Sequence, residues 1–205
     1  MVRYSPEEIE KFWREQNPRR RQLKADLDAR RLSYGVSVQN ISKNWNIGNL
    51  IRTANAFLCG EIILVGNEEF DATGCASIHR FEPMSHCPNP ASFRQYAHQA
   101  GYSIVAAEID QRAVWLPEFT YPPKPLFVFG SELAGLSDEM LDLADHHVMI
   151  PQYGLIPCLN VNVSCSIVLY DYITRTYPDI VPVPIDGAKF KIDPGSGQRS
   201  LPRGE

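Results

Sequence analysis

The chain has 205 residues, of which 44% are hydrophobic and 21% are charged. This composition excludes collagen-like, disordered and disulfide-scaffold proteins for most of the chain, and the length predicts one domain with an accessory segment. No apolar run approaches the roughly 18 residues that cross a bilayer, and no apolar leader opens the chain. The five cysteines form no Cys-x-x-Cys pair, so we expect no metal site and no disulfide framework, and a reduced cytoplasm fits best.

The net charge of −4 is unevenly distributed. Between Lys11 and Arg31 eight basic residues face three acidic ones, so this segment carries +5 and the remainder −9. A local basic patch can attract a polyanion even in an acidic protein. Arg19, Arg20 and Arg21 are therefore candidate RNA contacts, with a solvated helix face as the alternative.

Two short helices are predicted before residue 34. Ser5, Pro6 and Glu8 fit a capping box with proline at the first helical position. A second helix is expected to start after Pro18. Together they predict a basic helical hairpin over residues 1–34.

From about Val36 short apolar blocks alternate with helical patterns. Continuous apolar blocks indicate strands that are covered on both faces, as in parallel sheets. The predicted strands contain residues 37–38, 62–65, 103–107, 126–129 and 148–150, and the helical patterns lie at 47–58, 93–100, 138–144 and 163–175. This alternation predicts an α/β domain over residues 35–177 with helices on both faces. Five prolines and four glycines in residues 178–205 predict a tail without regular structure.

The first segment whose residues could take part in catalysis or binding runs from Asn46 to Ala54. It reads N-x-G-N-x-x-R-T-A. Asn46 stands where a helix cap is expected, and Arg52 lies on the first turns of that helix. An arginine near a helix start is a suitable phosphate clamp. The alternative is a capped amphipathic helix with one exposed arginine.

Two further segments follow predicted strands. Residues 129–136 read F-G-S-E-x-x-G-L, and residues 150–162 combine two prolines, a glycine and two asparagines. Ligands of open α/β sheets bind beyond the carboxyl ends of strands, which is where both segments lie. An ordinary strand-to-helix turn and a pair of capping asparagines are the alternatives.

Taken in this order, the three segments resemble the motifs of the SpoU (TrmH-type) branch of the SPOUT methyltransferases, over about residues 36 to 175. The resemblance implies transfer of a methyl group from S-adenosylmethionine to a ribose 2′-hydroxyl of tRNA or rRNA. It also implies a C-terminal trefoil knot that holds the cofactor, and a homodimer. Ile167, Val168 and Tyr170 of the last helix are expected to supply an interface face.

The resemblance assigns roles to individual residues. The implied catalytic residues are Asn46, Arg52, Glu132 and Asn160; the implied cofactor-binding residues are Gly130, Ile150, Cys158 and Leu159. Glycine is expected at position 130 because a side chain would obstruct close contact with the cofactor. Arginine is a poor base, since its pKa exceeds ~12, so Arg52 is expected to fix an RNA phosphate and to stabilise the developing alkoxide. The group that accepts the proton stays open.

The third motif departs from the family pattern at both of its ends. The third motif usually reads S-L-N-V-S, whereas this chain has Cys158 and Asn162 at its ends. A thiol donates hydrogen bonds more weakly than a hydroxyl. A SPOUT protein that binds RNA or cofactor without efficient methyl transfer is therefore the alternative function. Cys165, on the following helix, is expected in the core.

Overall fold

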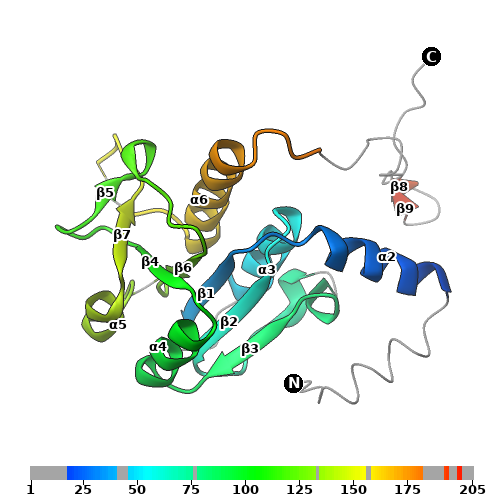
Figure 1. Ribbon diagram of the computed structural model, residues 1–205, viewed down its shortest axis with the longest axis horizontal. Coiled ribbons are helices and arrows are strands. Elements are labelled where there is room, and N and C mark those ends of the chain that lie inside the picture. Colours follow the sequence, from blue (N-terminus) through cyan, green and yellow to red (C-terminus); the bar gives the residue numbers. More distant parts are fainter. Residues whose placement is uncertain are drawn as a thin grey trace.

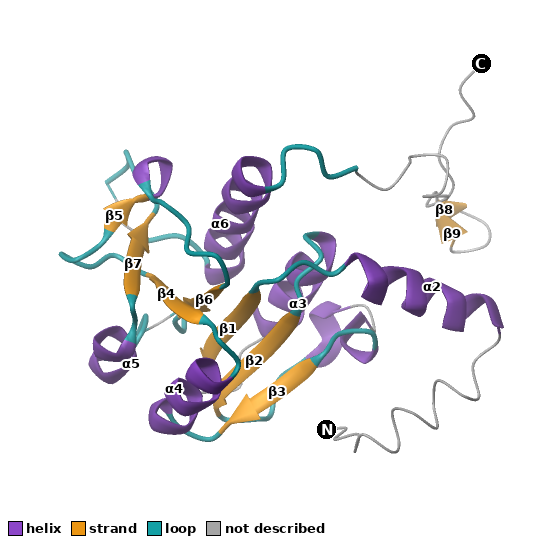
Figure 2. Cartoon of the chain, in the orientation of Figure 1, coloured by secondary structure: helices purple, strands orange, loops and turns teal. Residues whose placement is uncertain are grey.

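The computed structural model describes residues 18–40, 46–75, 78–132, 134–155, 158–181, 192–193 and 198–199 (Figures 1 and 2). The first predicted helix, around residues 5 to 13, lies outside these residues. The second is α2 (Pro18–Arg30), which Figure 1 shows projecting beside the sheet. None of the helices in this part of the chain is long and apolar enough to cross a membrane.

Seven parallel strands form one sheet, in the order β3-β2-β1-β6-β4-β7-β5. Their bounds are β1 Gly35–Asn40, β2 Glu61–Gly66, β3 Met84–Cys87, β4 Ser103–Ala107, β5 Val114–Trp115, β6 Pro125–Phe129 and β7 His146–Met149. The predicted α/β class is thus confirmed. In the tail, the short strands β8 (Ile192–Asp193) and β9 (Gln198–Arg199) pair antiparallel, where no regular structure was predicted.

Helices cover both faces of the sheet, as the sequence predicts. One core cluster joins the sheet to α3 (Asn46–Ala56) and α6 (Val161–Thr176), and the other joins it to α4 (Pro90–Gln99) and α5 (Asp138–Leu143). Neighbouring strand residues alternate between the clusters: Ile62 and Leu64 belong to the first, Ile63 and Val65 to the second. The apolar strands are continuous because both of their faces are buried.

Within the seven-stranded sheet, the two strands that the sequence did not predict, β3 and β5, are the edge strands. His86 in β3 is exposed, and so are both residues of β5, Val114 and Trp115. Edge strands are short and incompletely covered, so they lack the continuous apolar run that marks a central strand.

Arg31, directly after α2, ties the end of this helix to the body. Arg31 donates to the carboxylate of Glu82 at 2.7 Å and to the carbonyl oxygens of Phe81 (2.7 Å) and Cys59 (2.8 Å). The Glu82 side chain is completely buried, and its other oxygen accepts from Asn55 Nδ2 at 2.6 Å. The C-terminal end of the basic helix α2 is therefore held in place against the rest of the protein.

Candidate active site

Three polar side chains from three distant segments meet above the carboxyl edge of the sheet. Asn46 begins α3 after β1, Glu132 follows β6, and Asn160 caps α6 after β7. Asn46 Nδ2 donates to Glu132 Oε2 at 2.5 Å. Asn160 Nδ2 donates to Asn46 Oδ1 and to Glu132 Oε1, both at 3.0 Å. The structure thus joins three of the four residues implied as catalytic in a closed ring of hydrogen bonds.

The ring is oriented by helix capping. Asn160 Oδ1 accepts the backbone N–H of Asn162 at 3.0 Å, so the amide nitrogen of Asn160 is left to face Asn46 and Glu132. The capping interpretation of this asparagine is therefore confirmed, and the same residue takes part in the ring. Asn46, in contrast, is the first residue of α3 rather than the cap before it.

Arg52, the fourth residue, lies outside the ring. It is exposed on α3, and its guanidinium donates to the carbonyl oxygen of Gly74 at 3.4 Å, a long hydrogen bond. Gly74 belongs to η1 (Ala72–Cys75), which packs against α3. The side chain thus rests loosely at the surface, where a polyanion can reach it.

Thr53 and Asn162 form a contact that sequence reasoning missed. Thr53 Oγ1 donates to Asn162 Oδ1 at 2.8 Å, and Asn162 O accepts from Ser166 Oγ at 2.7 Å. The bond between Thr53 and Asn162 joins α3, which carries Asn46, to α6, which Asn160 caps. The second residue that departs from the family pattern, Asn162, thereby has a structural role of its own.

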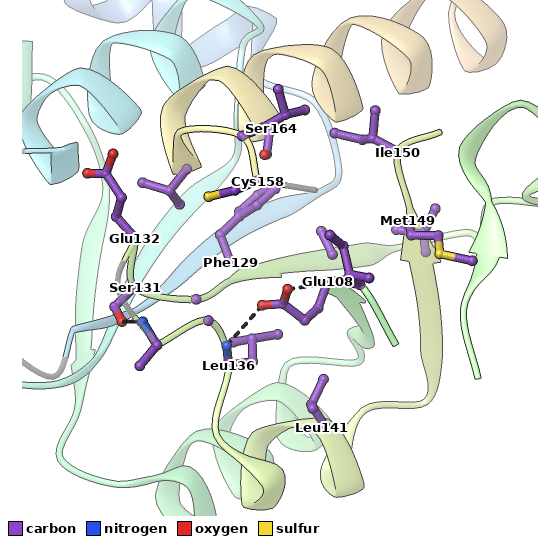
Figure 3. Close-up of a pocket in the computed structure, with 18 of the residues that line it drawn as sticks. Glu108, Phe129, Ser131, Glu132, Leu136, Leu141, Met149, Ile150, Cys158 and Ser164 are labelled. Atoms are coloured by element: carbon purple, nitrogen blue, oxygen red, sulfur yellow. Dashed lines mark hydrogen bonds between the residues drawn. The ribbon is translucent and has the colours of Figure 1, made fainter. Parts of the chain in front are cut away.

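A cavity of about 400 Å³ opens beside the ring, at the ends of β4, β6 and β7 (Figure 3). Its wall includes Glu132 and all four residues implied to bind the cofactor: Gly130, Ile150, Cys158 and Leu159. Small-molecule sites typically measure 300–1,000 Å³ and combine apolar walls with a few polar groups. Here Phe129, Val148 and Ile150 are among the apolar residues, and Ser131, Gln152 and Ser164 among the polar ones. This mixture fits the flat adenine and the polar ribose and amino-acid parts of S-adenosylmethionine.

Gly130 has a different reason to be glycine from the one predicted. A Cβ at this position would lie 2.0 Å from the carbonyl carbon of Gly135 and 2.3 Å from the nitrogen of Leu136. The chain turns back there, because Ser131 and Gly135 exchange backbone hydrogen bonds of 3.0 and 2.9 Å. The close approach is thus between two parts of the protein's own backbone, and a cofactor is not needed to explain it.

The two cysteines near the site have opposite environments. Cys158 is exposed and lines the cavity, whereas Cys165 is fully buried. Cys165 is therefore a core residue, as predicted, and its burial raises the pKa of the thiol well above its usual value. Among the described residues, no three His, Cys, Asp or Glu side chains gather as metal ligands.

Comparison with known proteins identifies the family. The model of the SpoU rRNA Methylase family matches residues 34–170. The tRNA (guanosine(18)-2′-O)-methyltransferase of Aquifex aeolicus is 27% identical over 157 residues, which cover 75% of this chain and 74% of that protein. The enzyme of the same name from Thermus thermophilus is also 27% identical, over 75% of this chain and 80% of its own length.

Solved structures of SpoU and TrmH-type methyltransferases are similar to this protein as well. The TrmH/SpoU tRNA modifying enzyme of A. aeolicus superposes with a TM-score of 0.65 at 25% identity, covering 80% of this chain and 81% of that chain. The SpoU methyltransferase AviRb from Streptomyces viridochromogenes, in complex with AdoMet, has a TM-score of 0.60 at 25% identity, covering 74% and 61%. The chain therefore belongs to the SpoU rRNA Methylase family.

Proposed function

We propose that this protein transfers the methyl group of S-adenosylmethionine to a ribose 2′-hydroxyl of tRNA. Its family membership makes it an S-adenosylmethionine-dependent RNA 2′-O-methyltransferase. One observation carries the proposed site: Glu132 belongs both to the hydrogen-bonded ring and to the wall of the 400 Å³ cavity. A methyl donor in the cavity and a hydroxyl at the ring would therefore be neighbours.

The proposed roles follow from the contacts. S-adenosylmethionine supplies an electrophilic methyl group when bound. The amides of Asn46 and Asn160 each donate to one oxygen of Glu132, which orients the carboxylate at the edge of the cavity. Arg52 would fix an RNA phosphate and stabilise charge that develops on the ribose oxygen. Gly130, Ile150, Cys158 and Leu159 would hold the cofactor, and the chain after β6 would form the trefoil knot implied by the resemblance.

The proposed substrate is tested by mapping methylation. Purified protein, labelled S-adenosylmethionine, and tRNA and rRNA from cells that lack this protein are incubated together. A 2′-O-methyl group blocks alkaline cleavage at one nucleotide, so the position can be identified. We expect labelled tRNA, and no label in a tRNA with 2′-deoxyribose at that nucleotide. Label in rRNA alone would contradict the tRNA assignment, whereas binding of RNA and cofactor without label would favour the alternative function.

We further propose a homodimer with α6 at its interface. Ile167 and Tyr170 are 37% and 63% exposed, and they line an open apolar groove of about 670 Å³ with Tyr153 and Val163. Val168, which was also predicted for this face, is fully buried, so that part of the prediction was wrong.

The dimer gives a prediction for Ile167→Glu. A carboxylate in an apolar interface loses its hydration without gaining a partner. The variant should sediment as a monomer at micromolar concentration, while the wild type and Thr176→Glu, a matched change at an exposed position on the same helix, sediment as dimers. A wild-type monomer under these conditions would contradict the proposed dimer.

The basic helix α2 is proposed to bind RNA phosphates through Arg19, Arg20 and Arg21. Changing all three to Ala should weaken the binding of all RNA sequences alike. The slope of log affinity against log salt should fall by up to about 0.9 per lost contact to a duplex, and less on single strands. Turnover at saturating RNA should be nearly unchanged, because these residues bind ground and transition states equally. An unchanged salt slope would leave α2 with a packing role only.

We also propose a division of the chain into three parts and a location in the cytoplasm. Residues 1–34 would form the RNA-binding extension, residues 35–177 the methyltransferase domain and residues 178–205 a tail. All five cysteines are free thiols, which agrees with work on tRNA in the reducing cytoplasm.

A further inference from the structure

Glu108 is a carboxylate in the cavity that belongs to none of the three motifs. It directly follows β4. Glu108 and Glu132 are the two charged side chains among the described residues that line the cavity. Glu132 is engaged by Asn46 and Asn160, and Figure 3 shows it pointing away from the centre, whereas the Glu108 carboxylate lies among the residues of the wall. The motifs therefore leave one acidic group of the cavity without a role.

The backbone holds this carboxylate in place. Glu108 Oε2 accepts the N–H of Leu136 at 3.0 Å, and Oε1 accepts the N–H of Ile109 at 2.9 Å. Gly135 leaves room for it, since a Cβ there would lie 2.6 Å from Oε2. A carboxylate offers about four acceptor positions, so about two remain for groups inside the cavity.

Holding the 131–136 turn is one possible role for Glu108, but it does not account for these remaining positions. Leu136, Leu141 and Val148 line the same cavity and offer no side-chain donors. Glu108 is partly buried, and a ligand that enters the cavity displaces its water, so the ligand must itself supply hydrogen-bond donors to the carboxylate. The vicinal hydroxyls of a ribose provide two donors to one carboxylate. In other α/β nucleotide sites an acidic residue accepts a hydrogen bond from the ribose.

We propose that Glu108 accepts hydrogen bonds from the ribose hydroxyls of the cofactor and so determines its specificity for a ribonucleoside. This assignment rests on the proposed function, because it requires S-adenosylmethionine in the cavity. The neighbouring apolar side chains of Phe129, Val148 and Ile150 suit the adenine of the same nucleoside.

The test is calorimetric binding of three compounds to the full chain. S-adenosylhomocysteine carries both hydroxyls and the amino-acid part, its 2′,3′-dideoxy analogue lacks the hydroxyls, and 5′-methylthioadenosine lacks the amino-acid part. Each is titrated into the wild type, Glu108→Gln and Glu139→Gln, a matched change at an exposed position of α5. The ratio of two affinities measured on one variant does not depend on how much of that variant is folded.

Glu108→Gln should weaken S-adenosylhomocysteine and 5′-methylthioadenosine about tenfold or more, since it loses charge-assisted hydrogen bonds. It should leave the already weaker binding of the dideoxy analogue nearly unchanged, and Glu139→Gln should behave as the wild type. Equal weakening of S-adenosylhomocysteine and the dideoxy analogue would make Glu108 a support of the turn only. Weakening that spares 5′-methylthioadenosine would assign it to the amino group. A wild type that binds none of the compounds would contradict the proposed function as well.

Discussion

Arg52→Ala should lower the rate of methyl transfer at saturating RNA and cofactor by roughly a hundredfold or more. Removal of one donor that stabilises transition-state charge has this effect in other enzymes. The affinity for S-adenosylhomocysteine should stay unchanged, because Arg52 does not line the cavity among the described residues. The fold should tolerate the change, since the side chain is exposed and its hydrogen bond to Gly74 is long at 3.4 Å.

Two further variants separate charge from geometry. Arg52→Lys keeps the positive charge but loses the planar, two-pronged donor, so its rate should lie between those of the wild type and Arg52→Ala. Arg112→Ala removes an exposed arginine that pairs with Asp110 and Asp142 and belongs to none of the three motifs, and it should leave the rate unchanged. A near wild-type rate for Arg52→Ala would show that the catalytic assignment is wrong, and an equal loss in Arg112→Ala would show a general effect of charge.

The central part of the fold was predictable because burial on both faces leaves a continuous apolar pattern. Residues 62–65 and 126–129 lie in strands β2 and β6 as predicted. The edge strands β3 and β5 carry no such pattern, and their pairing depends on neighbours that are distant in the sequence. The family prediction is confirmed by the match over residues 34–170.

The positions of the three motifs were predictable from topology, whereas their contacts were not. Parallel strands end at one edge of a sheet, so segments that follow β1, β6 and β7 lie near one another. The ring joins Asn46 to Glu132 and Asn160, which are 86 and 114 residues away in the chain. No local pattern specifies that these three side chains bond to one another. Glu108 escaped notice for a related reason, since its backbone partner Leu136 is 28 residues away.

Gly130→Ala should destabilise the protein by about 3 kcal/mol, a typical upper value for an overpacked interior. The added Cβ would meet backbone atoms of Gly135 and Leu136 at 2.0 to 2.4 Å, and a backbone cannot rotate away as the end of a side chain can. The turn must therefore shift, and the cavity wall that includes Gly130 and Gly135 shifts with it. The affinity for S-adenosylhomocysteine should fall together with the free energy of unfolding, measured in urea.

Two other glycines give a graded comparison for this change. Gly135→Ala should cost about 1–2 kcal/mol, because its φ of +65° disfavours a side chain, while the Glu108 carboxylate that it would contact can move. Gly154→Ala should stay within about 0.5 kcal/mol of the wild type, since a Cβ there meets no atom within 4 Å. If Gly130→Ala unfolds at the same urea concentration as Gly154→Ala and binds the cofactor product equally well, the 131–136 turn is not as tightly packed as the structure shows. A loss in the free energy of unfolding that is largest for Gly130→Ala, smaller for Gly135→Ala and smallest for Gly154→Ala would support the structure. It would show that Gly130, in the second motif, must be glycine because of contacts within the backbone, before any ligand is bound.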